Sequence, residues 1–137
     1  MTIDAEQALY GKLSTTAGIT ALCSTRIYPL DLPPSVTLPA VTYQIIDAPI
    51  EATHDEAAGS SLVYARHQIT SWATTYAASV ALAKQIHLAL QGFKGIITVG
   101  ADTFTIMSSL RAGKMPNKDP ETGLYWISQD YIIWYTE

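Results

Sequence analysis

The stretch LVYARHQITSWATTYAASVALAKQIHLALQ, residues 62–91, changes its hydrophobic period once and thereby decides the fold. Its first eleven residues alternate between apolar and polar, which is typical of a strand with one buried face. Its second part predicts an amphipathic helix over residues 76–91, which Thr74 or Thr75 can cap and Gly92 can end. The apolar stripe of this helix consists of Tyr76, Val80, Leu82, Ala83, Ile86 and Leu90.

More strands are predicted on both sides of this stretch. Residues 40–48 place Val41, Tyr43 and Ile45 on one face, and with residues 62–72 they predict a long hairpin whose tip lies around residues 55–60. Two short strands are expected at residues 96–99 and 103–111, and residues 112–123 are expected to form a loop because Gly, Pro, Asn and Asp gather there. Residues 124–135 form the last strand, which is apolar or aromatic on both faces.

A first helix near the N-terminus completes the pattern. Ala5, Leu9 and Leu13 fall at helical spacing, and Thr2 or Asp4 can cap the first turn. Two main helices among groups of strands predict an α+β fold. We expect one domain over residues 1–137, an antiparallel or mixed sheet with both helices on one face, and a long protruding β-hairpin.

Composition excludes several classes of protein. The 137 residues are 48% hydrophobic and only 15% charged, and no apolar run is long enough to span a membrane, so a soluble protein is expected. The net charge of −4 and the eight scattered Lys and Arg residues argue against a nucleic-acid-binding surface. A single cysteine, Cys23, excludes an internal disulfide framework and fits a reducing cytoplasm.

Candidate catalytic groups are few, and each has a simple structural explanation. His54, Asp55 and Glu56 are adjacent, but neighbouring side chains of an extended chain point to opposite faces, so a solvated hairpin tip is favoured over a metal site. His67 and Cys23 fit buried positions, and no phosphate-binding, zinc-binding or nucleophile-elbow motif occurs. We therefore predict no enzyme activity, no metal and no cofactor.

Aromatic residues are concentrated at the C-terminal end of the sequence. Tyr and Trp supply a large contact area at low entropic cost, so burial between subunits is an alternative to core packing for such residues. The residues concerned are Tyr125, Trp126, Tyr131, Trp134 and Tyr135.

An ordered set of short segments resembles the family of small tail-completion or tail-terminator proteins of tailed phages and prophages. The segments, in chain order, are ALY at 8–10, RIYP at 26–29, LPAVTY at 38–43, WATTY at 72–76, PETGLY at 120–125 and WY at 134–135. The resemblance implies a structural virion protein that caps the head-proximal end of the tail tube as a ring, typically a hexamer. Such a ring ends tube polymerisation and offers a docking surface to the head connector.

The resemblance also implies partners and a location. The partners are further copies of the chain, the tail tube protein and the head–tail connector, while genomic DNA passes through without specific binding; assembly takes place in the host cytoplasm and the protein ends in the virion. Two alternatives remain open, namely a neck or head-completion protein on the portal side, and a small cytoplasmic enzyme or ligand-binding domain. As subunit or partner contacts we predict His54, Asp55, Glu56, Lys114, Met115, Lys118, Tyr131, Trp134 and Tyr135.

Overall fold

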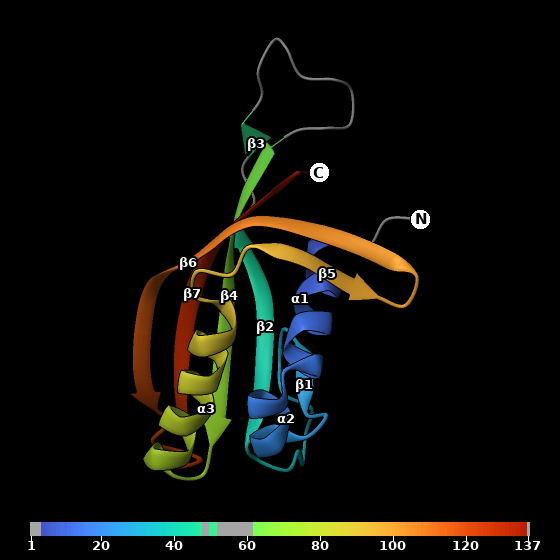
Figure 1. Ribbon diagram of the computed structural model, residues 1–137. Helices are drawn as coiled ribbons and strands as arrows, with labels where there is room; N and C mark the ends of the chain where they lie inside the picture. The colour runs from blue at the N-terminus through green and yellow to red at the C-terminus, as the bar shows by residue number, and fades with distance from the viewer. Residues whose placement is uncertain (1–3, 48–49, 52–61, 137) are drawn as a thin grey trace.

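Three helices lie against one face of a curled, mixed sheet in the computed structural model, which describes residues 4–47, 50–51 and 62–136 (Figure 1). The helices are α1 (Ala5–Thr15), α2 (Ala17–Cys23) and α3 (Tyr76–Leu90). The strands are β1 (Ile27–Pro29), β2 (Ala40–Asp47), β3 (Ile50–Glu51), β4 (Leu62–Ala73), β5 (Gly95–Val99), β6 (Asp102–Lys118) and β7 (Tyr125–Thr136).

The strand order places the last strand inside the sheet. The sheet runs β1-β2-β4-β7-β6-β5, with β3 paired to β4, so β7 lies between two long neighbours. The β1–β2 pair is parallel and the other pairs are antiparallel. The predicted α+β class with a mixed sheet is confirmed, and α2 adds a short third helix to the two that the sequence predicted.

Side-chain caps fix where the two longer helices begin. The Asp4 carboxylate accepts a hydrogen bond from the Gln7 backbone N–H at 2.8 Å, and the Gln7 side chain accepts from the Asp4 backbone N–H, which is a complete capping box. The Thr75 hydroxyl accepts from the Ala78 backbone N–H at 3.2 Å, so Thr75, and not Thr74, caps α3.

The core lies between the helices and the inner face of the sheet. Leu82, Ile86 and Leu90 of α3 are buried in the same cluster as Ile69 of β4 and Tyr131 of β7. Burial of each aliphatic side chain of this size contributes roughly 1.5–3 kcal/mol, so the α3 stripe is a main source of stability. The buried residues of α1 and α2, Leu9, Leu13, Ile19 and Cys23, join this cluster.

The prediction of a loop at residues 112–123 is wrong for residues 112–118, which belong to β6. β6 continues to Lys118 and pairs with β7 over its whole second half, and the reversal occupies only the residues after Lys118. The Asp119 carboxylate stabilises this turn by accepting from the Glu121 backbone N–H and from the Thr122 hydroxyl, each at 2.9 Å. Pro116 is tolerated because β5 pairs only with residues 102–106 of β6, which leaves the outer edge of the second half free.

Two bulges bend β6. The register skips Met107 between Ile106 and Ser108, and skips Ala112 between Arg111 and Gly113, while β7 continues without a break. An extra residue bends the bulged strand and increases its twist. β5 and the first half of β6 accordingly fold over the top of the sheet towards α1 (Figure 1).

The arms of the predicted hairpin form an antiparallel ladder. Residues of β2 pair with β4 from Ala40 opposite Trp72 to Asp47 opposite Arg66, and β3 extends the pairing to Leu62. The tip that we predicted around residues 55–60 lies outside the described residues.

Candidate functional site

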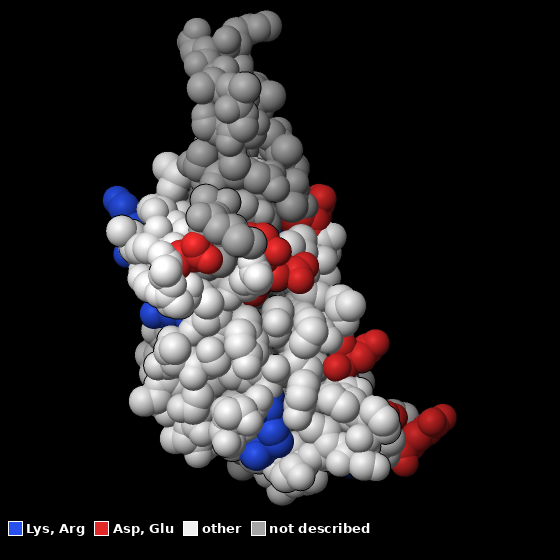
Figure 2. Space-filling model, turned by 90° about the vertical axis from the view of Figure 1, so that its right-hand side faces the viewer, with Lys and Arg blue, Asp and Glu red and all other residues white. Residues whose placement is uncertain are grey.

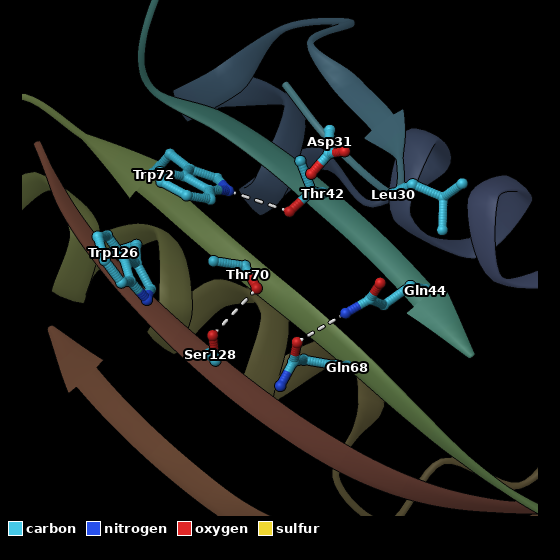
Figure 3. Close-up of a pocket in the computed structure, with 9 residues that line it drawn as sticks. All are labelled: Leu30, Asp31, Thr42, Gln44, Gln68, Thr70, Trp72, Trp126 and Ser128. Carbon is cyan, nitrogen blue, oxygen red and sulfur yellow. Dashed lines mark hydrogen bonds between the residues drawn. The ribbon is translucent and has the colours of Figure 1, made fainter. Parts of the chain in front are cut away.

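The sheet face opposite the helices carries rows of polar and aromatic side chains that bind one another across the strands (Figure 3). The Trp72 indole N–H donates to the Thr42 hydroxyl at 3.0 Å, and the rings of Trp72 and Trp126 lie 5.1 Å apart. The hydroxyls of Thr70 and Ser128 are hydrogen-bonded at 3.1 Å. Because these polar groups already have partners, this face forms a rigid, half-buried surface.

A shallow hollow of about 230 Å³ opens on this face between the β1–β2 connection and the sheet. Its lining residues are Leu30, Asp31, Thr42, Gln44, Gln68, Thr70, Trp72, Trp126 and Ser128. Asp31 is the charged group among them, and the two indole rings offer π-faces. A flat apolar group or a cationic side chain matches this lining chemically.

An ion pair and an aromatic stack occupy the other half of the same face. The Arg66 guanidinium contacts the Asp130 carboxylate at 2.8 Å, and the Gln68 amide donates to the other carboxylate oxygen at 3.2 Å. The rings of Tyr64 and Trp134 are stacked at 4.8 Å. Trp134, one of the predicted contact residues, is therefore half-buried on the face that no described helix covers.

Along the second half of β6, no strand among the described residues pairs with the edge that faces away from β7; we call this the free edge. Nearly every residue from Leu110 to Lys118 is exposed, including Leu110 at 51% and Met115 at 60%. Large apolar side chains on a strand with one unpaired edge are typical of a contact surface. The predicted contact residues Lys114, Met115 and Lys118 all lie on this edge, although the sequence placed them in a loop.

The bulge at Ala112 determines which side chains of this edge lie on the helix side of the sheet. Residues directly opposite in a ladder share a face, so Arg111 opposite Tyr131 and Lys114 opposite Gln129 both lie on the helix side. In a strand that alternates without a bulge, positions 111 and 114 would point to opposite faces because they are three residues apart. Lys118, opposite Tyr125, also lies on the helix side, with its ammonium 5.1 Å from the Tyr125 ring centroid.

Two predicted contact residues are not available as contacts. Tyr131 is 0% exposed and Tyr135 is 5% exposed, because both point from β7 into the core beneath the helices. Burial raises the pKa of Tyr131 to about 12, and its hydroxyl donates to Gln129 Oε1 at 3.2 Å. We therefore leave both tyrosines out of any proposed interface. His54, Asp55 and Glu56 lie outside the described residues.

The remaining reactive side chains do not converge. His67 is buried at the centre of the core, and desolvation lowers its pKa to about 4. Burial raises the pKa of the Cys23 thiol, which disfavours the nucleophilic thiolate. Within the described ranges, no three His, Cys, Asp or Glu side chains come together as metal ligands would, and no helix combines the length and apolar character of a membrane span.

His87 marks the point where α3 meets the β6 edge. Its Nδ1 lies 3.3 Å from the Tyr131 hydroxyl, and burial, helped by the nearby charges of Arg111 and Lys114, lowers its pKa. The Gln91 side chain accepts from the Arg111 backbone N–H at 2.8 Å. These contacts hold the middle of the free edge firmly against the end of α3.

The fold and its surfaces indicate a class of protein. Exposed apolar side chains along an outer strand of a small α+β domain are typical of a surface that contacts other proteins, as a structural assembly protein has.

Comparison with known proteins identifies the family. Residues 7–136 match the model of the family described as "Tail completion protein gp17", and the chain belongs to this family of structural phage proteins. A solved structure, a chain of the "Virion of native gene transfer agent (GTA) particle", has the same fold with a TM-score of 0.68 and 15% sequence identity, over 97% of this chain and 95% of that one. No curated protein matched this sequence. The family that the sequence pattern resembled is confirmed, together with a structural role in tail assembly.

Proposed function

We propose that this protein forms a closed ring, a hexamer, that caps the head-proximal end of a phage tail tube. The ring ends polymerisation of the tube and presents a docking surface to the head connector. Membership of the tail completion family supports the general role. The particular role is our proposal.

The free β6 edge is the observation that carries this proposal. A ring requires two different patches on each subunit, one meeting the other on the next copy, and the rotation between copies must close. Between Leu110 and Lys118 the strand exposes apolar side chains together with an unpaired edge. A different surface is formed by α1 and β1: β1 is the first strand of the strand order, and α1 contacts β1 as well as β5.

The acidic balance of the chain is compatible with a ring around a DNA channel. At a net charge of −4 the protein repels the phosphate backbone overall, whereas a cationic lining would retain the DNA. We accordingly expect DNA to pass through the ring without specific binding.

Deletion and complementation of the gene in the phage test the role. We expect particles without this protein to yield tail tubes of irregular, extended length that are not joined to heads, and purified protein added in vitro to cap one end of such tubes as a ring in electron micrographs. Tubes of normal length in the deletion strain would contradict a terminator role.

The neck alternative predicts a different binding partner. Tagged protein should bind isolated tails if it terminates the tube, and isolated DNA-filled heads if it completes the neck on the portal side. Capture of filled heads alone would replace our proposal with the neck role.

A further inference from the structure

We propose that the β6 edge of one copy packs against the α1–β1 edge of the next copy, with cations meeting carboxylates on the helix side of the sheet and apolar side chains meeting on the open side. The inference rests on the proposed ring and specifies which surfaces close it. The occupant of the β6 edge is therefore a second copy of this chain.

The first surface is the β6 patch, which we define as Leu110, Arg111, Lys114, Met115 and Lys118. The three cations share the helix side because the bulge at Ala112 restores their phase. Leu110 lies opposite Ile132 and Met115 opposite Ser128, and both therefore lie on the open side. The patch thus has a basic layer and an apolar layer, both exposed.

The second surface is the α1–β1 patch, which we define as Asp4, Glu6, Tyr10, Leu30 and Asp31. Several of these residues lie around Tyr43 of β2. The Tyr10 ring lies 6.1 Å from the Tyr43 ring, and the Leu30 backbone N–H donates to the Tyr43 carbonyl at 2.9 Å. Burial raises the pKa of Tyr43, and the charges of Glu6 and Asp4 raise it further.

The α1–β1 patch has the same two layers with the opposite charge. Asp4 and Glu6 belong to the first turn of α1, on the helix side, and Leu30, 65% exposed, lies with Asp31 beside the hollow of the open face (Figure 3). Tyr10 is 39% exposed. On this side of the molecule, acidic side chains lie across the upper part and along the right edge, and basic ones lie along the upper left and at the lower centre (Figure 2).

Ring geometry matches the layers of the two patches. Copies related by rotation about an axis roughly parallel to the strands keep their helix sides on the same side of the ring wall. The ladder registers link Lys114 through Gln129 and Ile69 to Tyr43, so Lys114 lies at the level of the α1–β1 patch along the strands. Lys114 is therefore the cation that comes nearest to Glu6 of the next copy, and Leu110 and Met115 meet Leu30. Complementary potentials of this kind fix register and steer association.

Charges of the opposite sign also lie near each patch. Contacts within the chain hold them in place, as they hold Asp4 and Lys118 of the patches themselves. Next to the β6 patch, the Asp119 carboxylate accepts two hydrogen bonds in its own turn. Next to the α1–β1 patch, Arg26 Nε donates to the Pro39 carbonyl, and the Lys12 ammonium lies 4.1 Å from the Phe93 ring centroid. Glu121 is exposed, but it belongs to the turn that follows β6 and not to the strand that carries the β6 patch.

The contact is made by side chains and not by a continuous sheet. Pro116 removes one edge donor, and the bulge and the two lysines are features that natural edge strands use against strand-to-strand pairing. A side-chain contact of opposite charges weakens as salt is added.

Charge reversal tests the pairing in the full-length protein. We would prepare K114E/K118E, D4K/E6K and the variant that combines all four substitutions, and measure ring formation at high protein concentration by analytical ultracentrifugation and negative-stain microscopy. K84E/K94E is the matched control, because it reverses two exposed lysines outside both patches. Circular dichroism establishes that each variant is folded.

We expect each two-site variant to need about tenfold or more protein to assemble. The four-site variant should recover most of this loss because it exchanges the signs of both patches, and the control should assemble like the original protein. Rings of unchanged affinity in K114E/K118E, or no recovery in the four-site variant, would overturn the pairing while leaving the proposed ring intact. If the original protein forms no rings even on isolated tail tubes, the proposed function itself fails.

Discussion

His67 lies at the centre of the core with both ring nitrogens buried and without a hydrogen-bond partner among the described residues. An imidazole in this position is neutral at pH 7, because desolvation lowers its pKa from 6.5 to about 4. In the unfolded chain the same residue binds its proton near pH 6.5. Between these two pH values the unfolded state therefore holds more protons than the native state, so acid favours unfolding.

We predict that His67→Leu removes much of the acid sensitivity of the protein. In the original chain, the free energy of unfolding should have its full value above about pH 6.5 and should fall by roughly 3 kcal/mol as the pH approaches 4. Urea unfolding at several pH values between 4.5 and 7 measures this slope. His87→Gln is the control, since His87 is only partly buried, and an unchanged slope in His67→Leu would contradict the prediction.

At the same scale, the sequence could not decide which aromatic residues of β7 face outwards. Odd and even positions of residues 124–135 are both apolar or aromatic, so alternation alone gave no preferred face. The position of α3 settles the matter: it covers Tyr131, and Trp134 is left on the open face. Lys114, Met115 and Lys118 are exposed. For the two lysines this could be expected from the sequence, because charged side chains are seldom buried.

At the scale of elements, α3 was the most predictable part of the chain. Its stripe over residues 76–91 has helical spacing, and Leu82, Ile86 and Leu90 are indeed buried. β6 was the least predictable, because Gly113, Pro116 and Asn117 favour a loop locally. Pairing with β7 overrides this local preference. Because the pairing partner is distant in the sequence, residues 112–118 show no alternating hydrophobic pattern that would reveal a strand.

The cap of α3 provides a prediction at this scale. Thr75→Ala should lower the free energy of unfolding by about 1 kcal/mol, since the Ala78 backbone N–H loses its acceptor. Chemical denaturation measures the change. Thr74→Ala is the matched control at an exposed neighbouring position that does not cap the helix, and equal effects of the two substitutions would contradict the assignment.

At the scale of the whole molecule, the sequence predicted the class of fold and the family, but not the curl of the sheet. The curl depends on two single extra residues, Met107 and Ala112. The hydrophobic pattern of the sequence does not distinguish them from the residues beside them. The sequence could not predict the two edge surfaces either, because α1 and the β1–β2 connection come together around Tyr43 only when the chain is folded.

A deletion tests whether folding and assembly can be separated in this molecule. We predict that removal of residues 53–60 leaves cooperative thermal unfolding intact, because the β2–β4 ladder from Ala40 to Asp47 lies outside the deleted segment. Ring formation and complementation in the phage should be impaired. If unfolding became gradual and non-cooperative, the segment would belong to the core.

The skipped residue Ala112 is the one position of this stretch that the strand can lose without a change of face. Arg111 and Gly113 already lie opposite consecutive residues of β7, so a chain without Ala112 alternates regularly and keeps Lys114 and Lys118 on the helix side. Loss of one residue between Lys114 and Lys118, with the bulge kept, would instead send the side chains beyond it to the other face. Natural variants of this family should therefore lose a residue at position 112 more readily than between Lys114 and Lys118.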